Sequence, residues 1–191
     1  MNKERFDVRR IVGLGVLTAI VIVLQMVGAF IRFGPFSISL TLAPIVIGAA
    51  LYGPVAGAWL GLVFGVVVLF NDSAPFLAVS ALGTAITVLL KGILCGFVSG
   101  LVYRALCKKN VWLAAIAAAI VCPVVNTGIF VIGCFIWFMP TIAGWGAGLG
   151  FEDGISYLFL GMIGINFLIE LGINIVLSSV IVKILAAIRE N

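Results

Sequence analysis

Long apolar runs alternate with short polar breaks along the whole chain, and this pattern predicts membrane-spanning helices. A bilayer core of about 30 Å requires about 20 apolar residues per helix. Breaks at charges, prolines and glycine clusters divide the 191 residues into six apolar runs. Their approximate bounds are 11–31, 38–52, 55–70, 76–105, 111–138 and 156–188. Since no soluble domain is inserted between them, we expect one all-α integral membrane domain over residues 1–191, with six transmembrane helices in one bundle.

Composition strengthens this prediction and narrows the chemistry. Hydrophobic residues make up 64% of the chain and charged residues 9%, against about 45–50% and about 25% in soluble domains. This composition excludes a soluble globular domain, a disordered chain and a nucleic-acid-binding module. The sequence has no histidine and no C-x-x-C pair among its four cysteines, so we expect no metal site and no cofactor. It also lacks the phosphate-loop motif that binds ATP.

Basic residues predict the orientation of the helices. Nine of the eleven Lys and Arg residues fall at the N-terminus, between the fourth and fifth runs, or at the C-terminus. They are Lys3, Arg5, Arg9, Arg10, Arg104, Lys108, Lys109, Lys183 and Arg189. With six crossings these three regions share one side of the membrane. The positive-inside rule therefore predicts that both termini are cytoplasmic.

Small residues recur at every fourth position in three of the predicted helices. The positions are Gly53, Gly57, Gly61 and Gly65 in the third, Gly92, Gly96 and Gly100 in the fourth, and Gly15 and Ala19 in the first. In lipid, such stripes allow two helix backbones to approach closely. Two interpretations stay open for each stripe, namely packing inside the bundle and docking on another membrane subunit.

Polar side chains lie near the middle of three predicted helices, where they are costly and usually functional or paired. Lys91 is in the fourth, Asn126 in the fifth and Glu170 in the sixth, where Asn166 and Asn174 share its helix face. One interpretation is a structural Lys91–Glu170 ion pair. Another, compatible with the first, is that Lys91 meets an anionic group or that these polar residues line a ligand cavity, and a proton relay is a third.

Two outer connections carry further candidate residues. The segment from Asn71 and Asp72 to Pro75 has turn chemistry. The stretch from Trp137 to Asp153 is rich in glycine and contains Trp145. These tryptophans are expected either in the aromatic belt at the lipid headgroups or stacked on a ligand beneath a glycine-rich loop that closes as a lid.

Three stretches carry a resemblance to a known family. They are ISLTLAPIVIGAALYGPVAGAWLGLVFGVV at 38–67, PVVNTGIF at 123–130 and NFLIELGINIVL at 166–177. With these segments the chain resembles the substrate-binding S component of an energy-coupling factor (ECF) vitamin transporter over nearly its whole length. The run of residues is most similar to the pantothenate and folate group of these proteins.

The resemblance implies a membrane-embedded, high-affinity binding subunit of an ATP-driven importer in the plasma membrane of a bacterium. Such subunits bind one water-soluble vitamin near the outer face, then engage a transmembrane coupling subunit and two ATPases, and topple to release the vitamin inside. The family's docking motif on the first helix is Ala-x-x-x-Ala. Here Gly15 and Ala19 occupy those positions, so a glycine replaces the first alanine and the small-residue spacing is kept.

Carried over residue by residue, the resemblance places a substrate site on the outer half of the later helices. The outer turn contributes Asn71 and Asp72, the fourth helix Ser80, Thr84 and Lys91, the fifth Asn126 and Thr127, and the sixth Asn166 and Glu170, while Trp137 and Trp145 stack or cap. Amides, hydroxyls and one cation in an apolar setting suit a small polar acid, and pantothenate is the substrate we favour.

Other function classes make different demands on the sequence. A small proton-coupled secondary carrier that uses Glu170 is the nearest alternative, and a non-catalytic membrane assembly subunit is another. A membrane enzyme would need a histidine, a paired acidic cluster or a Ser–Lys dyad. Ser80 and Ser99 are the serines to consider with Lys91, and neither is four residues from it. We therefore expect no enzymatic activity.

Overall fold

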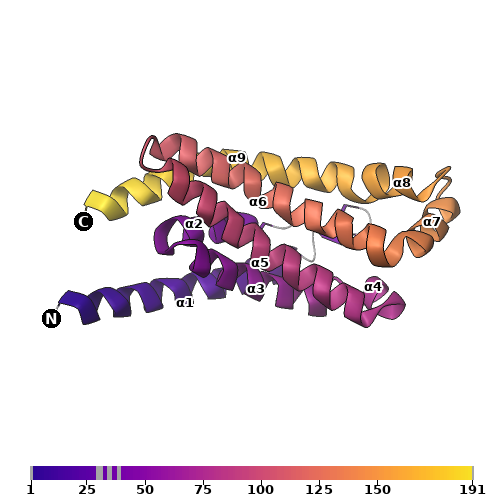
Figure 1. The fold of residues 1–191 in the computed structure, drawn as a ribbon, viewed down its shortest axis with the longest axis horizontal. Helices are drawn as coiled ribbons and strands as arrows, with labels where there is room; N and C mark the ends of the chain where they lie inside the picture. The colour runs from indigo at the N-terminus through magenta and orange to yellow at the C-terminus, as the bar shows by residue number, and fades with distance from the viewer. Residues whose placement is uncertain (1, 29–31, 34–35, 38–39, 191) are drawn as a thin grey trace.

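The computed structural model describes residues 2–28, 32–33, 36–37 and 40–190, and these form an elongated bundle of helices (Figure 1). The long helices are α1 (Asn2–Gly28), α3 (Pro54–Asn71), α5 (Ala81–Leu106), α6 (Val111–Gly133) and α9 (Gly164–Glu190). The shorter elements are β1 (Arg32–Phe33), β2 (Phe36–Ser37), α2 (Leu42–Tyr52), α4 (Ala74–Val79), α7 (Met139–Gly148), α8 (Gly154–Ser156) and the π-helical segments η1 (Cys134–Phe138) and η2 (Tyr157–Ile163). Within the described residues, five helical stretches are long and apolar enough to cross a membrane, and α2 is a shorter apolar helix. The predicted class, a membrane bundle of helices, is confirmed.

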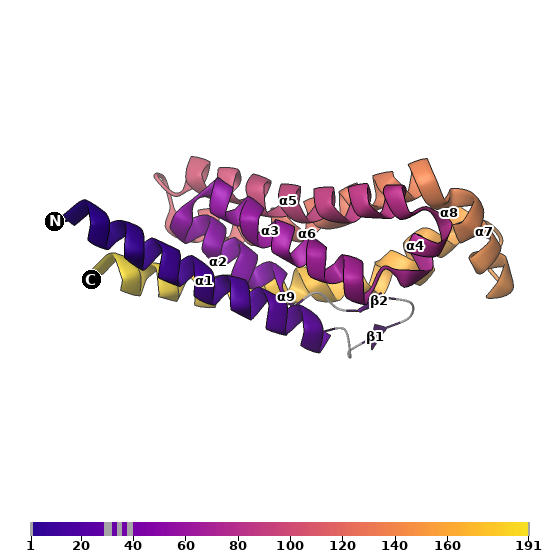
Figure 2. The same ribbon diagram turned by 90° about the horizontal axis from the view of Figure 1, so that it is seen from below.

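The start of α1 and the end of α9 lie at one end of the bundle (Figures 1 and 2). The connection between α5 and α6 lies at this end too, and α4, α7 and α8 gather at the opposite end. Exposed arginines and lysines accompany the first end: Arg9, Arg10, Arg104, Lys108 and Lys109. We call it the basic end and the other the capped end. The start of α1, the end of α9 and the α5–α6 connection therefore share one end of the bundle, as the charge pattern predicts.

The second predicted span is only partly helical. It was expected over 38–52, but α2 covers Leu42–Tyr52, 11 residues, which is about 16 Å of helix against a bilayer core of about 30 Å. Positions 38 and 39 lie outside the described residues, and 40 and 41 form a turn. Most of α2 is buried, so this helix lies inside the bundle, and its length corresponds to about half of a bilayer core. Before it, β1 and β2 pair antiparallel, with Arg32 opposite Ser37 and Phe33 opposite Phe36.

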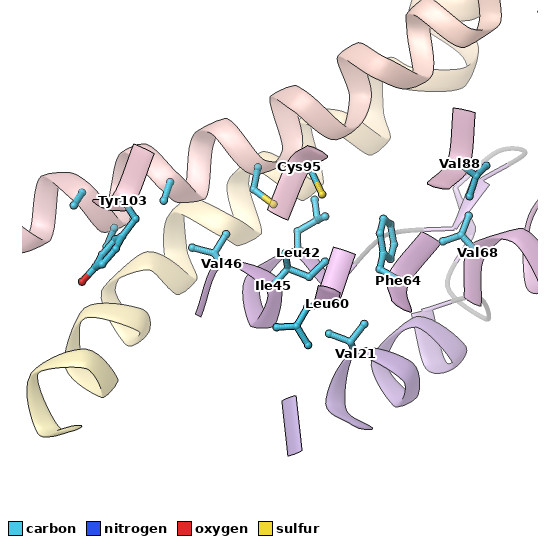
Figure 3. Packing of buried hydrophobic residues seen from close by; sticks show 14 residues of the cluster. Val21, Leu42, Ile45, Val46, Leu60, Phe64, Val68, Val88, Cys95 and Tyr103 are labelled. Atoms are coloured by element: carbon cyan, nitrogen blue, oxygen red, sulfur yellow. The ribbon is translucent and has the colours of Figure 1, made fainter. Parts of the chain in front are cut away.

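Apolar side chains from α1, α2, α3, α5 and α6 form one core. Val21, Leu42 and Leu60 are fully buried and lie close together, with Phe64 beside them (Figure 3). A second core occupies the capped end, where Phe76 of α4 meets η1, α7 and η2. The two cores hold the bundle on either side of the polar groups that the sequence placed at mid-depth.

The glycine stripes of α3 and α5 face one another. A Cβ added to Gly61 would overlap the carbonyl oxygen of Gly92, and one added to Gly57 would overlap that of Gly96. A Cβ on Gly65 would lie 2.9 Å from the Val88 carbonyl oxygen. These two helices therefore approach backbone to backbone. For these stripes, the structure shows packing inside the bundle rather than a free docking face.

Two expectations about the capped end differ from the structure. The fourth run, expected as one span over 76–105, breaks at Ser80, whose backbone is extended (φ −154°, ψ 101°). The glycine-rich stretch from Trp137 to Asp153 was expected as a loop, but it is helical as far as Gly148. The reason is tertiary packing: a Cβ on Gly146 would lie 2.7 Å from that of Tyr157, so the small residues let α7 pack closely on η2.

A short turn closes the capped end. Asp153 precedes α8, and its carboxylate accepts hydrogen bonds from the backbone N–H and the hydroxyl of Ser156. These bonds stabilise the charged carboxylate and lower its pKa. Asp153 thus acts as the N-cap of α8.

Candidate functional site

A cavity of about 90 Å³ lies among α3, α4, α5, α6, η1, η2 and α9, between the middle of the bundle and its capped end. Apolar side chains form about half of its wall and polar side chains the rest, so polar groups converge here on a partly apolar space, as they do in small-molecule sites. The polar lining residues are Asp72, Ser73, Thr84, Thr87, Lys91, Asn126, Thr127, Asn166 and Glu170. They come from four separate stretches of the sequence, so the fold assembles them.

Lys91 brings a positive charge into this cavity from the middle of α5. Its ammonium nitrogen lies 5.7 Å from the ring centroid of Phe64 and 5.4 Å from that of Phe130. Such distances allow cation–π attraction, which is strongest when the cation is removed from water. Glu170 lines the same cavity from α9 and is 6% exposed. The two ionisable groups that the sequence places at membrane depth therefore share one cavity, and their direct ion pair remains a prediction.

Two asparagines add amide groups to the lining. Asn126 on α6 is 5% exposed, and its Oδ1 accepts no hydrogen bond within the described part of the chain. Asn166 on α9 donates from Nδ2 to the Met162 backbone oxygen, 3.3 Å away. Buried polar atoms nearly always have a hydrogen-bond partner. The Asn126 oxygen is therefore a buried acceptor without a hydrogen-bond partner among the described residues, on a residue that lines the cavity.

The hydroxyl side chains at the start of α5 differ in whether they line the cavity. Ser80 caps α5 by accepting a hydrogen bond from the Gly83 N–H at 3.2 Å and is not part of the lining. Thr84 lines the cavity and donates to the Ser80 backbone oxygen at 2.7 Å. Thr87, one turn further, also lines it. The α5 wall thus presents Thr84, Thr87 and Lys91 on one helix face.

An aromatic cluster separates the cavity from a second hollow at the capped end. Phe76 of α4 packs edge to face on Phe130, Phe138 and Trp145, with centroid distances of 5.8, 5.0 and 5.5 Å. The outer hollow, of about 510 Å³, is lined by Trp145 and Tyr157 among others. Asp72, Phe76 and Met162 line both spaces. These three residues therefore form the boundary, which we call the mouth of the cavity.

The structure brings most of the predicted site residues together. Those that line the cavity are Asp72, Thr84, Lys91, Asn126, Thr127, Asn166 and Glu170, and Trp145 lines the outer hollow. Asn71, Ser80 and Trp137 line neither space. Asn71 is exposed at the end of α3, and Trp137 packs against Gly83, where an added Cβ would lie 2.7 Å from the indole ring.

Sequence reasoning missed several lining residues. Thr87 could have been found, because it follows Thr84 on the helix face that carries Lys91. Ser73, 3% exposed, donates to the Val68 backbone oxygen at 3.0 Å, and its place in a turn hid it. Phe76 gave no signal, because an aromatic residue in an apolar run is unremarkable until its contacts are known.

Comparison with protein families identifies the chain. The family model described as "ECF transporter, substrate-specific component" matches residues 9–182. The chain belongs to this family. The resemblance to this family is thereby confirmed, and the chain is a substrate-specific component of a membrane transporter. Comparisons with curated proteins and with solved structures gave no match, so the family alone does not name the vitamin that this S component binds.

Proposed function

We propose that this S component binds one small, carboxylate-bearing vitamin in the cavity beneath Phe76, with pantothenate as the first candidate, and delivers it to an ATP-driven ECF module. The observation that carries the proposal is that Lys91 and Asn126, whose Oδ1 accepts no hydrogen bond within the described residues, line the same cavity. A ligand with an anionic group and a hydrogen-bond donor would complement Lys91 and the Asn126 oxygen, in a cavity that Asp72 and Glu170 also line.

Pantothenate has the complementary groups. Its carboxylate matches the Lys91 ammonium, its hydroxyl and amide N–H groups match Asn126 and the threonines of α5, and its branched methyl groups match the rings of Phe130 and Phe138. A large flat ring system would fit these walls less well, because the lining offers edge-to-face rings rather than two parallel planes. Ligand binding also requires Phe76 to move, since about 90 Å³ is smaller than typical small-molecule pockets of about 300–1,000 Å³.

We further propose that the energising module docks on α1 at Gly15 and Ala19. A Cβ on Gly15 would meet no atom within 4 Å, and Ala19 is exposed. The apolar window of α1 is 17% buried, against 22–44% in the other four long spans. With the α3 and α5 stripes buried in each other, the stripe on α1 is the one available to the transmembrane coupling subunit. In the same proposal the basic end faces the cytoplasm, where the two ATPases act.

Uptake of radiolabelled pantothenate tests the proposal. The chain is expressed in cells with an ECF module, and uptake is measured after ATP depletion and, separately, after addition of a protonophore at constant ATP. We expect uptake to need the module and ATP and to survive the protonophore. Uptake without the module that collapses with the proton gradient would favour instead the secondary carrier that uses buried Glu170.

A further inference from the structure

Gln25 is a buried polar residue three positions before the end of α1. Its side chain is 1% exposed. The amide Nε2 donates to Oδ2 of Asp72 at 3.1 Å, and Oε1 accepts from the Thr41 hydroxyl at 3.2 Å. Thr41 is itself fully buried and directly precedes α2. One side-chain amide thus connects α1, the start of α2 and the end of α3.

Asp72 occupies a position from which this connection reaches the cavity. It follows the last residue of α3 and lines both the cavity and the outer hollow. The next residue, Ser73, begins the turn into α4, where its backbone oxygen accepts hydrogen bonds from Phe76 and Leu77 at 3.0 and 2.9 Å. The placement of Asp72 therefore governs where α4 starts and where Phe76 lies at the mouth.

Burial makes the hydrogen bonds of Gln25 important for stability. A glutamine amide inside an apolar bundle is unfavourable unless both its polar ends are hydrogen-bonded, and a bond to a carboxylate is among the stronger hydrogen bonds. We propose that Gln25 is a positioning residue, which fixes the Asp72 carboxylate at the mouth and thereby ties α1 to the entrance of the cavity. The proposal rests on the proposed function in taking this cavity as the substrate site and α1 as the docking helix.

The same helix carries the proposed docking face. Ala19 and Gly15 precede Gln25 by six and ten residues, so Gly15 is about 15 Å away along the helix axis. A displacement of α1 by the coupling subunit is transmitted through the Gln25 amide to Asp72 and to α4. Docking on α1 thereby weakens the contacts that hold Phe76 at the mouth of the cavity.

Hydrogen–deuterium exchange of the ligand-free protein in detergent tests the proposal without any assumption about the vitamin. The reporters are the α4 amides of Phe76, Leu77 and Ser80, all hydrogen-bonded in the structure. In Gln25→Leu these amides are expected to exchange on the order of tenfold faster, while the amides along the glycine stripe of α5 stay protected. Thr41→Val, which removes the hydroxyl that holds the Gln25 oxygen, is expected to give a smaller acceleration and serves if Gln25→Leu does not fold.

A control variant and a double variant separate a positioning role of Gln25 from general destabilisation of the protein. Ser99→Ala removes a buried hydrogen bond between α5 and α6, from Ser99 Oγ to the Ala118 oxygen at 3.1 Å, and is expected to leave the α4 amides unchanged. If Gln25 acts through Asp72, adding Gln25→Leu to Asp72→Leu accelerates exchange no further. Unchanged α4 exchange in both Gln25→Leu and Thr41→Val, equal acceleration in Ser99→Ala, or fully additive effects in the double variant would each overturn the proposal. Failure of pantothenate to bind would leave these results unaffected.

Discussion

Replacing Lys91 with methionine removes the cation from the cavity and keeps the length of an apolar side chain between Phe64 and Phe130. A hydrogen bond to a charged group contributes about 1.5–3 kcal/mol, and each 1.4 kcal/mol is about tenfold in Kd. Lys91→Met is therefore expected to weaken pantothenate binding by about ten- to hundredfold. The loss should appear in the dissociation constant measured by equilibrium binding to purified protein.

A matched control and a matched ligand make this prediction specific. Lys108→Met makes the same substitution at an exposed site of the basic end and is expected to leave the Kd unchanged. Pantothenol, which has an alcohol in place of the carboxylate, should bind the unmodified protein more weakly than pantothenate does, and Lys91→Met should bind the two about equally. Equal preference for pantothenate over pantothenol in both proteins would refute the reasoning, because Lys91 would then not meet the carboxylate.

Three other substitutions address docking, packing and the available amide. Ala19→Leu is expected to abolish uptake and to leave the Kd for the ligand unchanged. The control Ala105→Leu, at an exposed alanine of α5, should change neither quantity. Loss of ligand binding in Ala19→Leu would mean that this face of α1 packs internally. Gly61→Ala places a methyl group against the backbone of α5 and should lower the free energy of unfolding by about 1–3 kcal/mol. The control Gly172→Ala places its methyl group in open space and should not. Equal Tm values of the two variants in detergent would argue against close packing of the two glycine stripes. Asn126→Leu should raise the stability of the ligand-free protein by roughly 1–3 kcal/mol and weaken binding at least tenfold, and a stability loss together with unchanged binding would show that the amide serves the fold.

The site residues that could be predicted are those whose chemistry conflicts with the membrane. Lys91, Asn126 and Glu170 stand out in apolar helices because burial of such groups is costly, and the structure gathers them in one cavity. Gln25 belongs to the same class, and its position in the first span was a signal that sequence reasoning passed over. Its partner Asp72 was found only as part of a turn.

Other features depend on tertiary contacts that no local pattern contains. The stripes of α3 and α5 could be recognised, but their pairing at Gly61 needed the fold. The helical state of α7 runs against the low helix propensity of its glycines and depends on packing against Tyr157. Likewise, Phe76 forms the mouth only because α4 turns its ring toward three others. The capped end of this bundle was therefore harder to predict than its membrane-spanning helices.

The central claim is that this S component holds one carboxylate-bearing vitamin in the cavity beside Lys91. The most direct test is to purify the chain in detergent, denature it and identify the released small molecules by mass spectrometry, in parallel with Lys91→Met and Lys108→Met. We expect close to one molecule of a single carboxylate vitamin per chain, pantothenate being the first candidate, and we expect it to be retained in Lys108→Met and lost in Lys91→Met. A vitamin without an anionic group, or equal recovery from all three proteins, would contradict it.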